Sequence, residues 1–127
     1  MPQKPLIAVV DDDESMRDTT KDLLEAAGFR AATFASAEAF LSSGSLATTR
    51  CLIADMRMSG MSGLALHDHL AESKTPIPTI LITAYPEEPV RLRALAAGVL
   101  CYLTKPFTAE DLLACLDSAL QAGKVGT

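Results

Sequence analysis

The sequence predicts an α/β protein built on a doubly wound, five-stranded parallel sheet, and three observations indicate this. Short apolar runs typical of strands alternate five times with stretches of helical spacing along the 127 residues. The runs are mostly continuous rather than alternating with polar residues, as expected of strands covered on both faces. The repeated strand–helix order favours an open parallel sheet with helices on both sides, joined by right-handed crossovers.

The expected elements follow in order along the chain. The expected strands are residues 6–10 (LIAVV), 31–34 (AATF), 51–54 (CLIA), 79–83 (TILIT) and 101–104 (CYLT). The expected helices are residues 16–27, 36–44, 63–73, 86–98 and 108–123. Gly28 and Gly98 are typical helix stops, Ser36 is a typical N-cap, and Thr108 with Asp111 forms a capping box.

Composition limits the possible classes of protein. The length predicts a single domain over residues 1–127, with a flexible tail at about 123–127. A net charge of −5 argues against direct nucleic-acid binding, which needs clustered cations. The three cysteines are widely spaced, so neither a disulfide framework nor a zinc site is expected. The short apolar run near the N-terminus fits neither a signal peptide nor a membrane span, so we expect a cytoplasmic protein without membrane contact.

Polar side chains follow four of the five expected strands. The carboxyl ends of parallel strands share one edge of the sheet, where such folds bind ligands. Crowded carboxylates disfavour one another's ionisation unless a cation is present, and oxygen-only ligands suit Mg²⁺. A carboxylate at such a site can act as a nucleophile that becomes an aspartyl phosphate, with a lysine to neutralise phosphoryl oxygens. The residues concerned are Asp11, Asp12, Asp13, Asp55, Thr83, Thr104 and Lys105.

Each of these residues taken alone has a simpler interpretation. Asp13 or Glu14 can serve only to start a helix, where negative charge is favoured. A single strand-end threonine or a lysine before proline is usually structural or solvated. The coincidence of all of them at one edge is what favours a site. His67 and His69 lie two apart on a helix, point in different directions, and are expected at the surface.

Four sequence blocks resemble a known family in order and spacing. VVDDDES, IADMRMSGMSGLAL, ILITAYP and AGVLCYLTKPF are similar to the blocks of response-regulator receiver domains of two-component signalling, of the FixJ type. The resemblance covers residues 5–122. It implies a flavodoxin/CheY-like (βα)5 fold with strand order 2-1-3-4-5.

The resemblance also implies roles for individual residues. Asp55 is expected to be the phosphoacceptor, and Asp11 and Asp12 the acid pair around Mg²⁺, to which Asp55 and the backbone carbonyl of Arg57 also contribute. Lys105 is expected to pair with the phosphoryl group.

Two further residues are expected to act as the switch. The resemblance implies that Thr83 hydrogen-bonds the phosphoryl group and that Tyr102 then turns inward, although Tyr102 can also be a simple core aromatic. The resemblance also implies a cis peptide bond at Lys105–Pro106, of the X-Pro kind to which such bonds are largely confined. Ser59 departs from the family, because the FixJ type usually has proline there, in MPGM.

The implied function is a phosphorylation-dependent switch rather than a conventional enzyme, with self-phosphorylation and autodephosphorylation as its only chemistry. A sensor histidine kinase donates the phosphoryl group. The surface of the fourth helix, fifth strand and fifth helix then controls homodimerisation or an output module, by resemblance a C-terminal DNA-binding domain that would lie outside this chain. The candidate residues of this surface, most of which could instead simply belong to the core, are Val90, Leu92, Leu95, Val99 and Leu103.

Two alternatives remain open at this stage. A phosphatase of the haloacid dehalogenase type would use Asp11 as nucleophile and Asp13 as acid, with Glu87 and Glu88 as its only further acidic pair. A pseudo-receiver, an interaction module that is never phosphorylated, is the other alternative. The presence of all the site residues argues against the second.

Overall fold

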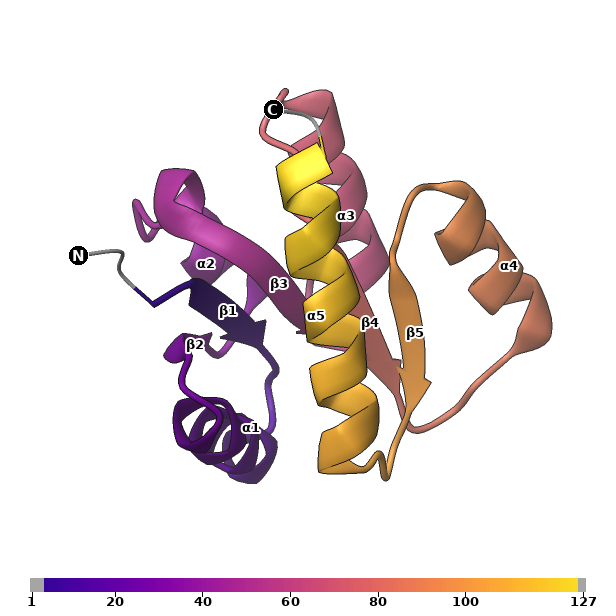
Figure 1. Ribbon diagram of the computed structural model, residues 1–127. Helices are drawn as coiled ribbons and strands as arrows, with labels where there is room; N and C mark the ends of the chain where they lie inside the picture. Colours follow the sequence, from indigo (N-terminus) through magenta and orange to yellow (C-terminus); the bar gives the residue numbers. More distant parts are fainter. Residues whose placement is uncertain (1–3, 126–127) are drawn as a thin grey trace.

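The fold is a five-stranded parallel sheet between two layers of helices, as the sequence predicts (Figure 1). The computed structural model describes residues 4–125. The strand order is β2-β1-β3-β4-β5. The strands are β1 (Leu6–Val10), β2 (Arg30–Phe34), β3 (Thr49–Asp55), β4 (Thr79–Thr83) and β5 (Cys101–Thr104). The helices are α1 (Glu14–Ala26), α2 (Ala37–Leu41), the 3-10 turn η1 (Leu46–Thr48), α3 (Gly63–Glu72), α4 (Glu88–Ala96) and α5 (Ala109–Val125).

Alternate residues of each strand fill two separate cores. Ala8 and Val10 of β1 face α2, α3 and α4, where Phe40 and Leu66 are fully buried. The intervening strand residues face α1 and α5 on the other side of the sheet. Their cluster contains Ile7, Val9, Leu24, Ile53, Ile80, Leu112 and Leu116. Because both faces are covered, the central strands have no polar side, which explains the continuous apolar runs in the sequence.

Helix ends largely follow the expected signals. The hydroxyl groups of Ser36 and Thr108 accept hydrogen bonds from the N–H groups of Ala39 and Asp111, at 3.0 Å each. Gly28 and Gly98 have φ values of +95° and +104°, a left-handed conformation that favours glycine. The Lys105–Pro106 peptide bond is cis, as expected.

Two helix lengths differ from the prediction. Helix α2 ends at Leu41 rather than near Gly44, because the hydroxyls of Ser42 and Ser43 bond to carbonyls of the preceding turn at 2.9 and 2.7 Å. Helix α5 continues through residues 123–125, where a flexible tail was expected, since a single glycine costs a helix only about 1 kcal/mol. The remainder of that expected tail, residues 126–127, lies outside the described residues.

The prediction for His67 is wrong. Its side chain is buried, whereas His69 is exposed as expected. His67 lies beside Leu66 and Leu70 on the inner side of α3, and its ring would be 3.9 Å from a Cβ at Gly98. The histidine ring thus packs close to the backbone at Gly98, on the inner side of α3.

Helix α4 is the least buried of the longer helices. Ala94 is its only fully buried residue, whereas Leu92 and Leu95 are 54% and 37% exposed. Helix α5, in contrast, contributes three buried residues to the opposite core: Leu112, Leu116 and Ala119. The cysteines lie on that same side as free thiols, Cys51 buried and Cys101 and Cys115 half-buried, as the sequence predicts.

We predict that Gly63→Ala destabilises the fold, because a Cβ at this position would lie 2.5 Å from the Asp55 carbonyl oxygen and 2.8 Å from Leu81 Cδ2. Overpacking of this kind costs about 1–3 kcal/mol, whereas helix propensity alone favours alanine over glycine by up to about 1 kcal/mol. Urea unfolding should show a lower midpoint for the variant. An unchanged or higher midpoint would contradict the close packing of α3 against the end of β3.

Candidate functional site

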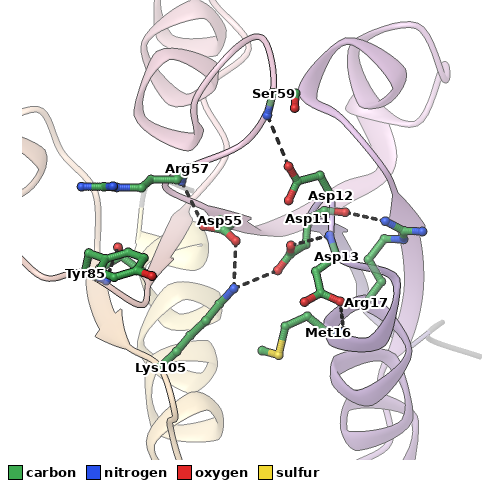
Figure 2. A network of polar contacts seen from close by, with 11 residues as sticks. Asp11, Asp12, Asp13, Met16, Arg17, Asp55, Arg57, Ser59, Tyr85 and Lys105 are labelled. Carbon is green, nitrogen blue, oxygen red and sulfur yellow. Dashed lines mark hydrogen bonds and ion pairs between the residues drawn. The ribbon is translucent and has the colours of Figure 1, made fainter.

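The carboxyl edge of the sheet brings together Asp11, Asp12, Asp55 and Lys105 (Figure 2). Strand β1 lies between β2 and β3, and β3 pairs with β4, so the chain reaches this edge at Asp11, Asp55 and Thr83 on neighbouring strands. Lys105 follows β5, whose Thr104 is in register with Thr83. The parallel order alone therefore places residues that are far apart in sequence at one site.

An ammonium group connects two of the carboxylates. Lys105 Nζ lies 2.8 Å from Asp55 Oδ2 and 3.4 Å from Asp11 Oδ2. The three side chains are only 19%, 10% and 8% exposed, so water screens this contact little. Burial alone would lower the pKa of Lys105, but the hydrogen bond to Asp55 and the two negative charges outweigh it, and the pKa is raised. Lys105 is therefore a cation at neutral pH.

The pKa of Asp11 is raised above its usual value of 3.8. Burial of the carboxyl group is the main cause, and the negative charge of Asp55 adds to it. The Asp13 N–H, which donates to Asp11 Oδ1 at 2.9 Å, and the Lys105 ammonium act in the opposite direction. The raised pKa means that the charged form of Asp11 is disfavoured here, mainly by burial and to a smaller extent by the neighbouring charge of Asp55.

Asp55 is held at the end of β3 by backbone and side-chain contacts. The N–H of Arg57 donates to Asp55 Oδ1 at 3.0 Å, which leaves Oδ2 to Lys105. The next backbone N–H, of Met56, donates to the Ile82 carbonyl at 2.8 Å, so β3 stays paired with β4 to its last residue. Asp55 is 8% exposed, and its position is fixed on both sides.

Asp12 and Asp13 point in different directions. Asp12 is exposed and its Oδ2 accepts a hydrogen bond from the Ser59 N–H at 3.3 Å. Asp13 is the N-cap of α1, and its Oδ1 accepts from the Met16 N–H at 3.3 Å, as expected of a helix start. Asp13 therefore has a structural role and does not join the cluster.

Three carboxylates form a potential cation site. One oxygen each of Asp11, Asp12 and Asp55 lies within 4.8 Å of the others. The donors are oxygens alone and too few to complete a coordination sphere, which suits Mg²⁺ because it retains several waters. The site's chemistry therefore fits this ion.

A small cavity of about 130 Å³ opens beside Asp55, lined also by Arg57, Thr83, Ala84, Tyr85 and Lys105. Thr83 is 1% exposed, and its Oγ1 accepts a hydrogen bond from the Tyr85 N–H at 3.1 Å. Tyr102, on β5, is half-buried and packs against the core formed with α2, α3 and α4. The side chain of Asp55 thus faces a space that a hydroxyl and an ammonium group also reach.

Sequence reasoning missed several contacts around the site. The Arg57 guanidinium lies 3.1 Å from Glu87 Oε1 and 5.0 Å from the Tyr85 ring centre, so it connects two loops at the sheet edge. Glu38 Oε2 accepts a hydrogen bond from the Met61 N–H at 3.2 Å. These contacts join segments 23 and 30 residues apart, for which the sequence carries no periodic signal.

A larger apolar groove adjoins the acidic site. Its volume is about 510 Å³, and it lies between α1 and the segment that follows β5. Lys105 lies at its boundary, so groove and acidic site are neighbours. The other lining residues are Met16, Thr19, Thr20, Leu23, Ala84, Pro106 and Phe107.

Comparison with known proteins identifies the family. Residues 7–117 match the model of the response regulator receiver domain. The chain is 39% identical to the response regulator protein TmoT of Ectopseudomonas mendocina, over 94% of the chain and 54% of TmoT. It is 34% identical to the transcriptional regulatory protein FixJ of Bradyrhizobium diazoefficiens, over 95% of the chain and 59% of FixJ. The chain thus spans about half to three fifths of the length of these relatives.

Solved structures agree with this assignment. The response regulator StyR is 41% identical with a TM-score of 0.87, covering 94% of this chain and 61% of StyR. The FixJ-N crystal structure is 32% identical with a TM-score of 0.84, covering 94% of this chain and 96% of FixJ-N. Among the described residues, no helix is both long and apolar enough to cross a membrane. The chain belongs to the response regulator receiver domain family, and its relatives place it with the FixJ type.

Proposed function

We propose that this chain is a phosphorylation-dependent switch in which Asp55 accepts a phosphoryl group from a sensor histidine kinase. The observation that supports this most is the position of Asp55 between two sites. It belongs to the cluster with Asp11 and Asp12, and it is the one acid of the three that lines the small cavity with Thr83 and Lys105. A phosphoryl group on Asp55 would therefore be in reach of a cation site, a hydroxyl and an ammonium group.

The proposed transfer needs little covalent chemistry from the protein. An Asp55 oxygen attacks phosphorus, the bond from phosphorus to the donor imidazole breaks, and the imidazole takes up a proton. The remaining requirement is positioning and charge neutralisation, to which Lys105 contributes a point charge. Asp11, Asp12, Asp55 and the Arg57 carbonyl would hold Mg²⁺, which supplies further neutralisation of phosphoryl oxygens.

The switch would begin at Thr83. The Thr83 hydroxyl oxygen accepts a hydrogen bond from the Tyr85 N–H, so its hydrogen-bond partner is Tyr85 and not Asp55. A phosphoryl group on Asp55 offers strong acceptor oxygens to the same hydroxyl. A shift of Thr83 would change the packing beside Tyr102, which is half-buried on β5. Phosphorylation can favour the shifted state only by as much as the phosphoryl group interacts more favourably with that state than with the unshifted one.

The surface of α4, β5 and α5 is the proposed output. Of the five apolar residues expected there, Leu92 and Leu95 are exposed, and Val90 and Leu103 are half-buried. Val99 is 3% exposed and belongs to the core, which was the other interpretation of these residues. We propose that this surface mediates homodimerisation or contact with a DNA-binding output domain, since relatives such as FixJ are longer transcriptional regulators.

We also propose where the kinase docks. The apolar groove between α1 and the segment after β5 borders Lys105, so it offers the kinase a docking surface beside the acceptor.

The cytoplasmic location remains a prediction from the sequence. The phosphatase alternative has no support, because Asp13 caps α1 instead of facing the cluster.

We predict that Asp55→Asn abolishes phosphorylation. The wild type, incubated with acetyl phosphate and Mg²⁺, should gain the mass of one phosphoryl group, and chelation of Mg²⁺ should prevent this. Asp13→Asn is the matched control, since asparagine also caps helices and Asp13 lies outside the cluster. An unmodified wild type would support the pseudo-receiver, and a modified Asp55→Asn would show that another residue is the acceptor.

We predict that Mg²⁺ binding weakens as the pH falls, beginning above the pH at which an ordinary aspartate protonates, because the pKa of Asp11 is raised. The folding stability of the metal-free protein depends on pH in the opposite direction from Mg²⁺ affinity. A raised folded-state pKa stabilises the fold at low pH, and this contribution is lost as the pH rises through that pKa. Asp11→Asn should therefore raise the urea midpoint at pH 7 without metal, and this gain should shrink toward pH 3.8, while Mg²⁺ affinity falls at least ~10-fold. A midpoint lower than that of the wild type at pH 7 would contradict the proposed crowding.

We predict that beryllium fluoride with Mg²⁺ shifts the wild type toward a dimer and that Leu92→Glu prevents the shift. Leu92 is 54% exposed on α4, and a charge there would be buried in the dimer. Light scattering during size-exclusion chromatography measures the mass. Ala71→Glu, at an exposed position on α3, is the control. Dimerisation of Leu92→Glu to the same extent as the wild type would place the interface elsewhere.

A further inference from the structure

The loop between β3 and α3, residues 56–62, is attached to the rest of the site by two carboxylates. The Ser59 N–H donates to Asp12 Oδ2 at 3.3 Å, and the Met61 N–H donates to Glu38 Oε2 at 3.2 Å. Figure 2 shows one oxygen of Asp12 turned toward Ser59 and away from Asp55. The loop that follows the proposed acceptor is therefore attached at two points.

Asp12 contributes to two different sites. Its carboxylate is one of the three in the proposed cation site, and it also accepts the hydrogen bond from the loop. Among the described residues, every buried side-chain nitrogen and oxygen has a hydrogen-bond partner. The metal-free site is therefore satisfied by groups of the protein itself: Lys105 for Asp11 and Asp55, and Ser59 N–H for Asp12.

We infer that the backbone N–H of Ser59 competes with the divalent cation for the Asp12 carboxylate, so that cation binding releases the Ser59 end of the loop. The inference rests on the proposed function for the cation site. At 3.3 Å the hydrogen bond is slightly longer than the usual range, so a shift of Asp12 toward Asp11 and Asp55 would break it. The coupling is reciprocal: the attached loop lowers the cation affinity, and the cation frees the loop.

The second attachment point, between the Met61 N–H and Glu38, stays in place when Ser59 is released. Gly60 has a φ of +81°, and a Cβ on it would lie 3.0 Å from Glu38 Oε2. The loop backbone is therefore closely packed against Glu38 on the side away from the cation site. Release at Ser59 moves the loop about Met61, rather than detaching it as a whole.

Proline and alanine at position 59 separate the backbone donor from the side chain. Ser59→Pro removes the N–H, whereas Ser59→Ala keeps it and removes only the hydroxyl. Calorimetric titration with Mg²⁺ should give a dissociation constant about three- to tenfold lower for Ser59→Pro than for the wild type, the worth of one modest hydrogen bond. Ser59→Ala is expected to bind Mg²⁺ as the wild type does. Equal or weaker binding by Ser59→Pro would overturn the inference.

A second measurement uses the wild type and does not depend on how the proline variant folds. Amide NMR should show that solvent exchange of the Ser59 N–H becomes faster when Mg²⁺ saturates the site, whereas that of the Met61 N–H does not change. An unchanged Ser59 amide at saturation would overturn the inference and leave the cation site intact. Absence of Mg²⁺ binding by the wild type, or undiminished binding by Asp12→Asn, would instead overturn the proposed function.

Discussion

Crowding of negative charge at the carboxyl edge of the sheet is the constraint on which the site depends. Lys105 connects Asp11 and Asp55, residues 94 and 50 positions away, and so ties the last strand to the first and third. Loss of Lys105 would leave both Asp11 and Asp55 buried without a cation, which costs several kcal/mol. The parallel strand order brings the two carboxylates close together, and the ion pair with Lys105 offsets their repulsion in the absence of metal. A site held in this way responds to any group that alters its charge.

The fold and the centre of the site could be predicted because each is imposed by a strong local rule. Strands covered on both faces must be apolar throughout, so residues 6–10, 79–83 and 101–104 are confirmed without change. Parallel strands end at one edge, so a polar residue at each strand end is enough to predict that Asp55 and Lys105 meet. The resemblance to receiver domains added the strand order, which the comparisons and the structure confirm.

The surroundings of the site could not be predicted, because they depend on contacts between surface residues on different segments. Nothing in the spacing of Glu38, Arg57 or Glu87 indicates which loops they connect. His67 packs near Gly98, 31 positions away, and its position two residues from His69 on a helix did not indicate this contact. The length of α5 depends on a small propensity difference at Gly123 that neighbouring residues override.

Helices α4 and α5, on opposite sides of the sheet, differ in how many buried residues hold them in place. With a single fully buried residue, α4 has little apolar area to lose, so displacing it requires only a small input of free energy. Helix α5 is fixed by three buried residues and offers a steady reference against which such a displacement can be read. A movement of α4 alone would therefore cost little free energy, while α5 keeps its place on the opposite face.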